Sequence, residues 1–525
     1  MPSSSRGSNR SQPFRKQIFL PAMQALQKGD RRNITPHRRG GMVADFVLTM
    51  KDIAMYWQTL LQQHFGFNEF RGCQQAAIQC VMNQQHALVI APTDSGKSLC
   101  YQIPALAYEA PGDLVLVLSP LVALMQDQVD ALRRRGIEAT FINSSLTAEE
   151  RSRRYSEVAQ GLYRLVYVTP ERFRKSAFRE VIAHRQVRLL AVDEAHCVSQ
   201  WGHDFRPDYT RIKEIREFLG NPTTLALTAT ATRECQQDIA TQLGMAIDEM
   251  TLFHEGIDRP NLRLDVEEVW GDADKLARIE QALSAAEYTE GSHIIYFSLI
   301  RTLESFSARM RDQGIHHLCY HGDLPRHQRR GIQNRFMAGD IDLVLATNAF
   351  GMGIDKENIR SVIHAETPSS IEAYYQEVGR AGRDGKSSQC LWLYDQADLM
   401  TQMQFIDWRN PDADYYGRLL YFLTNRAEEC RAFGLEWLND KLQKVSRHDH
   451  RLQTAISMLD RFGVIGGPQP PECFDVSEPH LHDRFGDKEL LDQKKKRDQQ
   501  RLLALVQLAR HSGDRKQFLE DYFMS

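Results

Sequence analysis

The sequence predicts an α/β protein with two tandem parallel-sheet units and a mainly helical C-terminal region. Short apolar runs alternate with helix-length polar segments over most of the chain, a pattern typical of a parallel sheet covered by helices. One of these runs leads into a Gly-Lys-Ser turn, and a later one ends in two adjacent carboxylates. The length of 525 residues suits about three to four domains. No apolar run approaches the roughly 18 residues of a membrane span.

The first candidate site follows the apolar run Leu88–Ile90. The residues between this run and the next helical pattern include Thr93, Asp94, Ser95, Gly96, Lys97 and Ser98. A loop between a strand and a helix suits an anion, because backbone N–H groups and the positive end of the helix face it. Lys97 would reach the β- and γ-phosphates of a nucleotide, and the Ser98 hydroxyl would bind Mg²⁺. Ala91 stands where the strict motif has glycine, so a chance Gly-Lys-Ser is the alternative.

A segment ahead of this loop carries Phe67, Arg71 and Gln74. The amide of a glutamine can pair with both the donor and the acceptor on an adenine edge, and an aromatic face can stack on the ring. Helix packing is the alternative role for such a segment. Its position before a phosphate loop favours adenine binding.

A pair of carboxylates, Asp193 and Glu194, follows one of the strands expected next in the chain. These strands are 114–118, 139–142, 164–168, 188–192 and 224–227. Ligands of α/β sheets bind at the carboxyl ends of strands, which is where 188–192 delivers the pair. Asp193 would hold Mg²⁺, and Glu194 would orient and deprotonate an attacking water. A solvated turn is the alternative, but the order after Lys97 and Ser98 indicates the second half of a nucleotide-hydrolysing site.

The residues from Asp193 onward carry a resemblance to a known family. Asp193-Glu194-Ala195-His196 and the aromatic-rich stretch 197–209 resemble the DEAH box and loop of RecQ-family DNA helicases, of superfamily 2. The segments Phe70–Gln74, Leu118–Met125 and Ala226–Ala231 agree with that family. The resemblance is dense over roughly residues 60–395.

The aromatic-rich stretch has chemistry suited to single-stranded bases. Trp201 and Phe205 beside Arg206 offer stacking and cation–π contacts. A place in the core is the alternative for these aromatics. Aromatic residues among Gly, His, Asp and Pro do not form a packed helix face, which favours the surface role.

A second α/β unit is expected from about residue 270 to 395, with strands at 293–297, 316–320, 342–346, 360–364 and 389–394. Its stretch 346–356 places small residues where a backbone could approach nucleic acid or nucleotide. A later stretch contains Gln376, Arg380 and Arg383, with the two arginines on one helical face. The resemblance implies that Gln376 contacts the nucleotide, that Arg383 is the arginine finger, and that Arg380 is its coupling partner.

The expected domains are a basic extension (1–41), a helicase ATP-binding RecA-like P-loop lobe (42–250), a C-terminal RecA-like lobe (251–395) and a helical module (396–525). We expect 1–41 to be disordered; an arm that contacts phosphates and an organellar transit peptide are alternatives. Within 396–525, the pattern of residues 441–467 indicates a small helix-turn-helix or winged-helix element, or else ordinary helical packing. The run 494–497 is most simply a solvated basic face.

No structural zinc is expected. Asp514 stands where the resemblance implies a zinc-binding cysteine, and no C-x-x-C pair follows it. We expect the helices of that region to persist, held by packing alone.

The nine cysteines are odd in number and scattered, which favours a reducing compartment, the cytoplasm, or the nucleoid if the protein is bacterial.

Asp94 departs from the family, which has glycine at this position. A carboxylate tolerates the backbone of such a loop only in part. It also repels a triphosphate, by roughly 3 kcal/mol at ~6 Å and an effective dielectric of about 20. ATP binding would therefore be weakened about tenfold or more.

The leading prediction is an ATP-dependent DNA helicase that uses ATP and Mg²⁺ and unwinds duplex DNA in recombination or repair, 3′-to-5′ by resemblance. Its partners would be single-stranded and forked duplex DNA, bound through local patches, since the formal charge is −3. The alternative is a nucleic-acid-binding scaffold with weakened catalysis, because of Asp94 and the missing zinc ligands. An RNA helicase is a third interpretation, disfavoured by the aromatic-rich loop.

Overall fold

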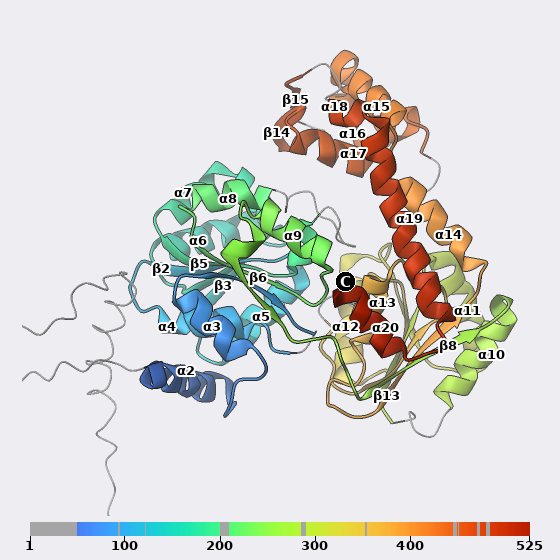
Figure 1. Ribbon diagram of the computed structural model, residues 1–525. Helices are drawn as coiled ribbons and strands as arrows, with labels where there is room; N and C mark the ends of the chain where they lie inside the picture. Colours follow the sequence, from blue (N-terminus) through green and yellow to red (C-terminus); the bar gives the residue numbers. More distant parts are fainter. Residues whose placement is uncertain are drawn as a thin grey trace, which may run out of the picture.

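Two α/β lobes lie side by side, and a helical region extends from them (Figure 1). The computed structural model describes residues 50–92, 95–120, 122–199, 209, 211–284, 290–351, 354–444, 449, 451–469, 473–478 and 483–524. The extension predicted for residues 1–41 lies outside this part of the chain. In the described part, no helix is both long enough and apolar enough to cross a membrane.

The first lobe is built on a seven-stranded sheet of order β3-β4-β2-β5-β6-β1-β7, and all its strand pairs are parallel. Its strands are β1 (His86–Ile90), β2 (Asp113–Leu118), β3 (Ala139–Ile142), β4 (Leu165–Val168), β5 (Gln186–Val192), β6 (Thr223–Thr228) and β7 (Met250–His254). Its helices are α2 (Met50–Phe65), α3 (Gln74–Met82), α4 (Leu99–Ala107), α5 (Val122–Arg134), α6 (Ala148–Ala159), α7 (Ser176–Ala183), α8 (Ile212–Phe218) and α9 (Arg233–Gln242), with 3₁₀ turns η1 (Pro170–Arg174), η2 (Ala195–Val198) and η4 (Ile247–Glu249).

Helices cover both faces of this sheet, which explains its continuous apolar runs. Ala87 and Val89 of β1 pack in the cluster that contains residues of α3, α4 and α5. Leu88 and Ile90 pack on the opposite face, with α6, α7, α8 and α9. Successive residues of a strand point to opposite faces, so both sets have to be apolar.

The second lobe has a six-stranded parallel sheet of order β10-β11-β9-β12-β13-β8. Its strands are β8 (Leu262–Glu268), β9 (Ser292–Tyr296), β10 (Leu318–Tyr320), β11 (Leu343–Ala346), β12 (Ile359–His364) and β13 (Ser388–Tyr394). Its helices are α10 (Gly271–Leu283), α11 (Ile300–Asp312), α12 (Arg326–Ala338) and α13 (Ile371–Val378). The predicted α/β fold with two tandem lobes is confirmed.

Two strands of the sheets were not expected. β7 and β8 lie at the edges of their sheets and are only partly buried. An edge strand meets fewer neighbours, so its sequence need not show the apolar run by which the central strands are recognised. The other strands agree with the expected ranges to within about two residues.

The C-terminal region divides into two parts. Its elements are α14 (Asp398–Arg409), α15 (Ala413–Asn425), α16 (Ala427–Lys441), α17 (Arg451–Arg461), β14 (Ile465–Gln469), β15 (Cys473–Val476), α18 (Asp483–Gly486), α19 (Lys488–Arg510) and α20 (Arg515–Met524). Elements α15 to α18 and the antiparallel β14–β15 pair share a core of their own. In contrast, α14, α19 and α20 pack in the same cluster as Tyr374 and Phe336 of the second lobe. α17 followed by the β14–β15 pair has the order of a winged helix, and that interpretation stays a prediction.

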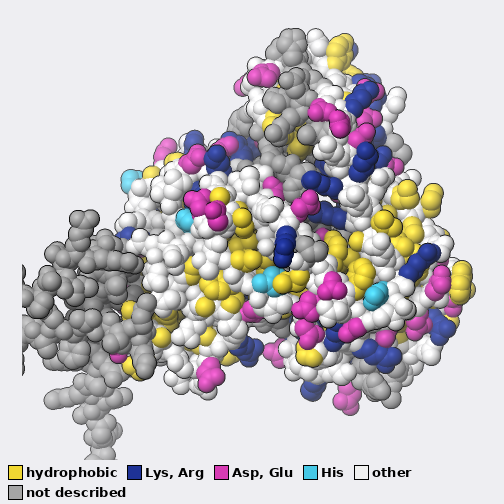
Figure 2. Space-filling model, viewed as in Figure 1, with side chains coloured by type: hydrophobic (Ala, Val, Ile, Leu, Met, Phe, Trp, Pro, Cys, Tyr) yellow, Lys and Arg dark blue, Asp and Glu magenta, His cyan; other side chains and the backbone are white. Residues whose placement is uncertain are grey.

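The basic run 494–497 is not simply a solvated face. Lys494 Nζ donates to Asn410 Oδ1 at 2.6 Å, and burial lowers the pKa of Lys494. Arg497 lies 3.6 Å from Glu234 of α9 in the first lobe. Figure 2 shows further Lys and Arg side chains at the junction of the C-terminal region with the lobes. The run therefore joins α19 to its neighbours.

Candidate active site

The phosphate-loop candidate lies between β1 and α4, as the sequence predicts. Gly96 has φ +73°, a conformation that glycine adopts without strain. A Cβ at this position would lie 2.7 Å from the Gln74 side-chain nitrogen. Both facts explain why glycine stands here. Thr93 and Asp94 lie outside the described residues.

Gln74 binds the loop itself. Its Nε2 donates to the carbonyl oxygens of Ser95 and Gly96 at 2.7 and 3.2 Å, and its Oε1 accepts from the Arg71 N–H at 3.0 Å. Adenine recognition would require exchange of these bonds, and that role stays a prediction. Phe67 is 44% exposed and lies 5.8 Å from the Arg71 guanidinium, so its ring is available for stacking.

The Lys97 side chain bonds to the backbone just before the loop, and the charges of the acidic pair act on it. Its ammonium donates to the carbonyl oxygens of Ala91 and Pro92, both at 2.8 Å. Burial lowers the pKa of Lys97, the carboxylates of Glu194 and Asp193 oppose this shift, and the charge of Arg383 adds to it. The charge of Arg383 in the second lobe therefore acts on Lys97 in the phosphate loop of the first.

The acidic pair follows β5, where the sequence placed it. Burial, and then the neighbouring Glu194, raise the pKa of Asp193 to about 7, against the opposing effect of Lys97. Glu194 has φ +50°, a left-handed conformation that is strained for a residue other than glycine and is common at functional sites. His196 Nδ1 lies 3.4 Å from Glu194 Oε2 and 3.0 Å from Thr228 Oγ1 at the end of β6. His196 thus links Glu194 to Thr228, which gives the segment Ala226–Ala231 a structural role next to the acidic pair.

The arginine segment follows α13. Arg380 is buried, and its guanidinium donates to the carbonyl oxygen of Gly351. Arg383 pairs with Asp355; the arginine side chain is 9% exposed and the aspartate 74%. Gln376 is half-buried on α13, in the turn before these arginines. The sequence did not point to Asp355 as a partner, since no spacing pattern links it to Arg383.

The residues present fit a nucleoside triphosphate with a divalent cation. Ser95 Oγ is buried and has no hydrogen-bond partner in the described part of the chain, so it is available to a ligand. Lys97 and Arg383 supply positive charge for phosphate oxygens, and Asp193 supplies a carboxylate oxygen, the ligand type that Mg²⁺ prefers. Ser98 directly precedes α4, and its hydroxyl would join them.

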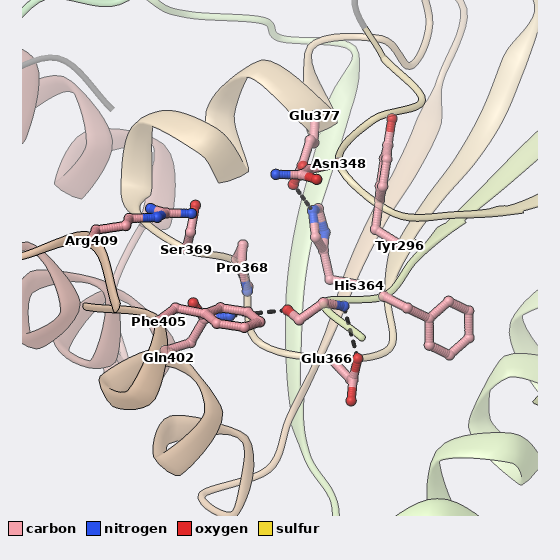
Figure 3. A pocket seen from close by; sticks show the side chains of 12 residues that line it. Tyr296, Asn348, His364, Glu366, Pro368, Ser369, Glu377, Gln402, Phe405 and Arg409 are labelled. Atoms are coloured by element: carbon pink, nitrogen blue, oxygen red, sulfur yellow. Dashed lines mark hydrogen bonds and ion pairs between the residues drawn. The ribbon is translucent and has the colours of Figure 1, made fainter. Parts of the chain in front are cut away.

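A pocket of about 160 Å³ opens in the second lobe, at the ends of β9 and β12 and against α14. Its lining residues are Tyr296, Phe297, Ser298, Asn348, His364, Glu366, Pro368, Ser369, Glu377, Gln402, Phe405 and Arg409. Figure 3 shows Phe405, Gln402 and Arg409 reaching it from α14. His364 Nε2 lies 2.8 Å from Glu377 Oε2, which links the pocket to α13. Of these residues, the sequence had singled out only the stretches that contain Asn348 and Glu377.

The aromatic-rich loop, with Trp201, Phe205 and Arg206, lies outside the described residues. Its predicted contact with single-stranded bases therefore stays a prediction. Tyr209, at the end of that stretch, is buried in the first-lobe core.

Comparisons with known proteins relate this chain to helicases. A DEAD/DEAH box helicase family model matches residues 71–238, and a helicase conserved C-terminal domain model matches residues 274–385. The chain is 40% identical over 340 residues to the ATP-dependent DNA helicase RecQ of Haemophilus influenzae, covering 65% of this chain and 53% of that protein. With RecQ of Bacillus subtilis the identity is 42% over 352 residues, covering 67% and 58%. The chain thus spans little more than half the length of these relatives.

A further relative is covered more fully. The probable ATP-dependent DNA helicase RecS of Bacillus subtilis is 36% identical over 373 residues, which is 71% of this chain and 73% of that protein. Among solved structures, helicase MrfA bound to DNA aligns with a TM-score of 0.55 at 18% identity, covering 80% of this chain and 62% of that one. At this identity the likeness concerns the fold alone. The chain belongs to the RecQ family of ATP-dependent DNA helicases.

Proposed function

We propose that this protein is an ATP-dependent DNA helicase that hydrolyses ATP with Mg²⁺ between its two lobes. The observation that carries the proposal is the convergence of Lys97, Asp193 with Glu194, and Arg383. The first three belong to the first lobe and the last to the second, so the complete set exists only when the lobes meet. Closing and opening of the lobes would then be coupled to the chemistry.

The residues have distinct roles in this proposal. Lys97 exchanges its two backbone carbonyl contacts for phosphate oxygens, and Ser98 and Asp193 hold the cation. Bound Mg²⁺ would offset the negative charge of the phosphates. Glu194, kept in place by His196, orients the attacking water and takes its proton. Arg383 stabilises the charge that develops in the transition state.

Single-stranded and forked DNA are the proposed partners, with movement 3′-to-5′ as in the family. The relatives named above are DNA helicases, which favours DNA over RNA. The pocket beside α14 supports a path across the second lobe, since Arg409 suits a phosphate and Phe405 suits a base. In a cell the protein would act on chromosomal DNA in recombination or repair, and in a bacterium within the nucleoid.

The test is ATP hydrolysis by the 525-residue chain without nucleic acid, with single-stranded DNA, and with RNA of the same sequence. We expect DNA to stimulate hydrolysis more than RNA, and the chain to open forks that carry a 3′ single-stranded arm. Lys97→Ala should abolish hydrolysis and leave DNA binding largely intact. Hydrolysis at the wild-type rate in that variant would refute the phosphate-loop assignment.

A scaffold without efficient catalysis is the second candidate, favoured by Asp94 in the phosphate loop. It predicts DNA binding with no ATP hydrolysis above that of the Lys97→Ala variant. The same titration therefore separates the two functions.

A further inference from the structure

The linker between the two sheets, residues 255–261, forms hydrogen bonds with the arginine segment after α13. β7 ends at His254 and β8 begins at Leu262, and Arg259 lies between them. Its guanidinium donates to three carbonyl oxygens that surround Arg380, those of Gly379, Ala381 and Gly382, at 3.3, 3.0 and 3.2 Å. The fork of an arginine can hold several acceptors at once in a fixed geometry.

Asn261 holds the same segment from closer to Arg383. Its Nδ2 donates to the carbonyl oxygens of Gly382 and Lys386 at 2.7 and 3.0 Å. Gly382 has φ +58°, and a Cβ there would lie 2.8 Å from both the Lys386 carbonyl oxygen and Ser388 Oγ. The backbone from which Arg383 departs is therefore closely packed against the linker.

The C-terminal helix α20 holds the other side of the linker. Lys516 Nζ donates to the carbonyl oxygens of Arg259 and Pro260 at 2.9 and 3.2 Å. The ring of Phe523 lies 5.4 Å from that of Tyr375 on α13, and the Tyr375 hydroxyl donates to the Ile257 carbonyl oxygen at 2.8 Å. α20 and α13 lie side by side (Figure 1). Packing alone was expected to hold this helix, and the structure adds these polar bonds.

We propose that α20 and the linker form a brace that positions Arg383 for ATP hydrolysis. Lys516 fixes the Arg259 backbone, and the Arg259 side chain fixes the carbonyl groups around Arg380. These contacts in turn fix the backbone from which the Arg383 side chain extends. Lys516 and Arg259 are positioning residues, since neither is part of the phosphate-binding set. The brace rests on the proposed function of Arg383, and it makes the C-terminal helix a working part of the ATPase.

Loss of a brace contact should slow turnover without weakening ATP binding. A displacement of about 1 Å in a catalytic group can cost about 100-fold in rate. We expect Lys516→Met to lower kcat about tenfold, and Arg259→Lys, which loses the fork, to lower it between about tenfold and 100-fold. The Kd for ATP should stay within about twofold, because Arg383 acts in the transition state.

The experiment measures kcat at saturating ATP and DNA, the Kd for ATP and the melting temperature, all on the whole chain. Lys516→Arg should recover most of the lost rate, because it keeps a donor at that place. Lys488→Met is the matched control, since Lys488 is exposed at the start of α19, and it should turn over as the wild type does. A loss of kcat in Lys516→Met that follows its melting temperature alone, with equal loss in Lys488→Met, would overturn the brace.

A double variant distinguishes positioning from general stability. If Lys516 acts through Arg383, adding Lys516→Met to Arg383→Ala should cause no further loss of kcat. Full additivity of the two losses would overturn the brace. A slow Arg383→Ala variant together with a wild-type rate in Lys516→Met would also overturn it and leave the proposed function standing. A wild-type rate in Arg383→Ala would instead refute the arginine's proposed role.

Discussion

The two lobes use the same turn between a strand and a helix in opposite ways. In the first lobe, β1 leads through Gly96 and Lys97 into α4, and a lysine cation lies at the turn. In the second lobe, β9 leads into α11, and the buried carboxylate of Glu366 accepts from the N–H groups of Ser298 and Leu299 at 2.8 and 2.9 Å. The N-terminus of a helix attracts an anion in both cases.

The difference teaches that the backbone plan alone does not make a nucleotide site. The second lobe satisfies its helix N-terminus with a carboxylate of its own and uses that turn as a structural joint. The first lobe places a cation there instead, which leaves the turn suited to an external phosphate. In the proposed function, the second lobe would contribute to catalysis from another element, the segment after α13.

The largest expected effect tests whether the first lobe binds ATP while the second lobe stabilises the transition state. Arg383→Ala should lower kcat about 10³-fold or more, because an arginine finger stabilises only the transition state. The Kd for ATP, measured by titration with a non-hydrolysable analogue, should change little. An equal loss of ATP affinity would make Arg383 a ground-state ligand and place part of the binding site in the second lobe.

The next effect concerns whether Asp94 does in the first lobe what Glu366 does in the second. If the Asp94 carboxylate competes for the phosphate site, Asp94→Gly should tighten ATP binding about tenfold or more and raise the rate of hydrolysis. Both quantities are measured at saturating DNA and matched ATP. Equal values in the two proteins would show that the side chain turns away from the nucleotide.

The aromatic-rich loop offers a test of where the first lobe meets DNA. Trp201→Ala and Phe205→Ala should each weaken single-stranded DNA binding by about 1–3 kcal/mol, the usual contribution of a stacked base. DNA stimulation of hydrolysis should fall with it, while basal hydrolysis stays near the wild-type rate. Intact stimulation in both variants would return these aromatics to the core and leave the second-lobe pocket as the main DNA contact.

A smaller effect is expected when the Glu366 carboxylate is removed from the turn between β9 and α11. Glu366→Ala leaves two partly buried N–H groups without their acceptor, at a cost of about 1–3 kcal/mol in stability. Hydrogen exchange at Ser298 and Leu299 should become faster, while ATP affinity stays unchanged. Glu366→Gln, which keeps an acceptor oxygen, is the control and should lose less. Weakened ATP binding in Glu366→Ala would show that the two turns are coupled.

The smallest effect is expected when metal ions other than Mg²⁺ are removed from the protein. A zinc chelator should not lower the melting temperature, because the helices α19 and α20 are held to the second lobe by buried apolar residues and the bonds of Lys516. Elemental analysis of the purified chain should find no stoichiometric zinc. One zinc per chain would refute this prediction.

Local chemistry was readable from the sequence because it depends on neighbouring residues. Apolar runs marked the central strands, and the turn before Lys97 and the pair Asp193 and Glu194 were recognisable from strand, loop and residue type. The family resemblance then assigned roles to Arg380 and Arg383, which spacing alone could not do.

Tertiary structure decided the contacts between segments far apart in the chain. Only the fold lets the charge of Arg383 act on Lys97, and only the fold brings Arg259 to the arginine segment and Lys516 to Arg259. It also recruits α19 and α20 to cover the second sheet, although the chain between α14 and α19 forms a separate core. These contacts depend on hydrogen-bond geometry and packing in three dimensions, for which a linear pattern of polar and apolar residues carries no signal.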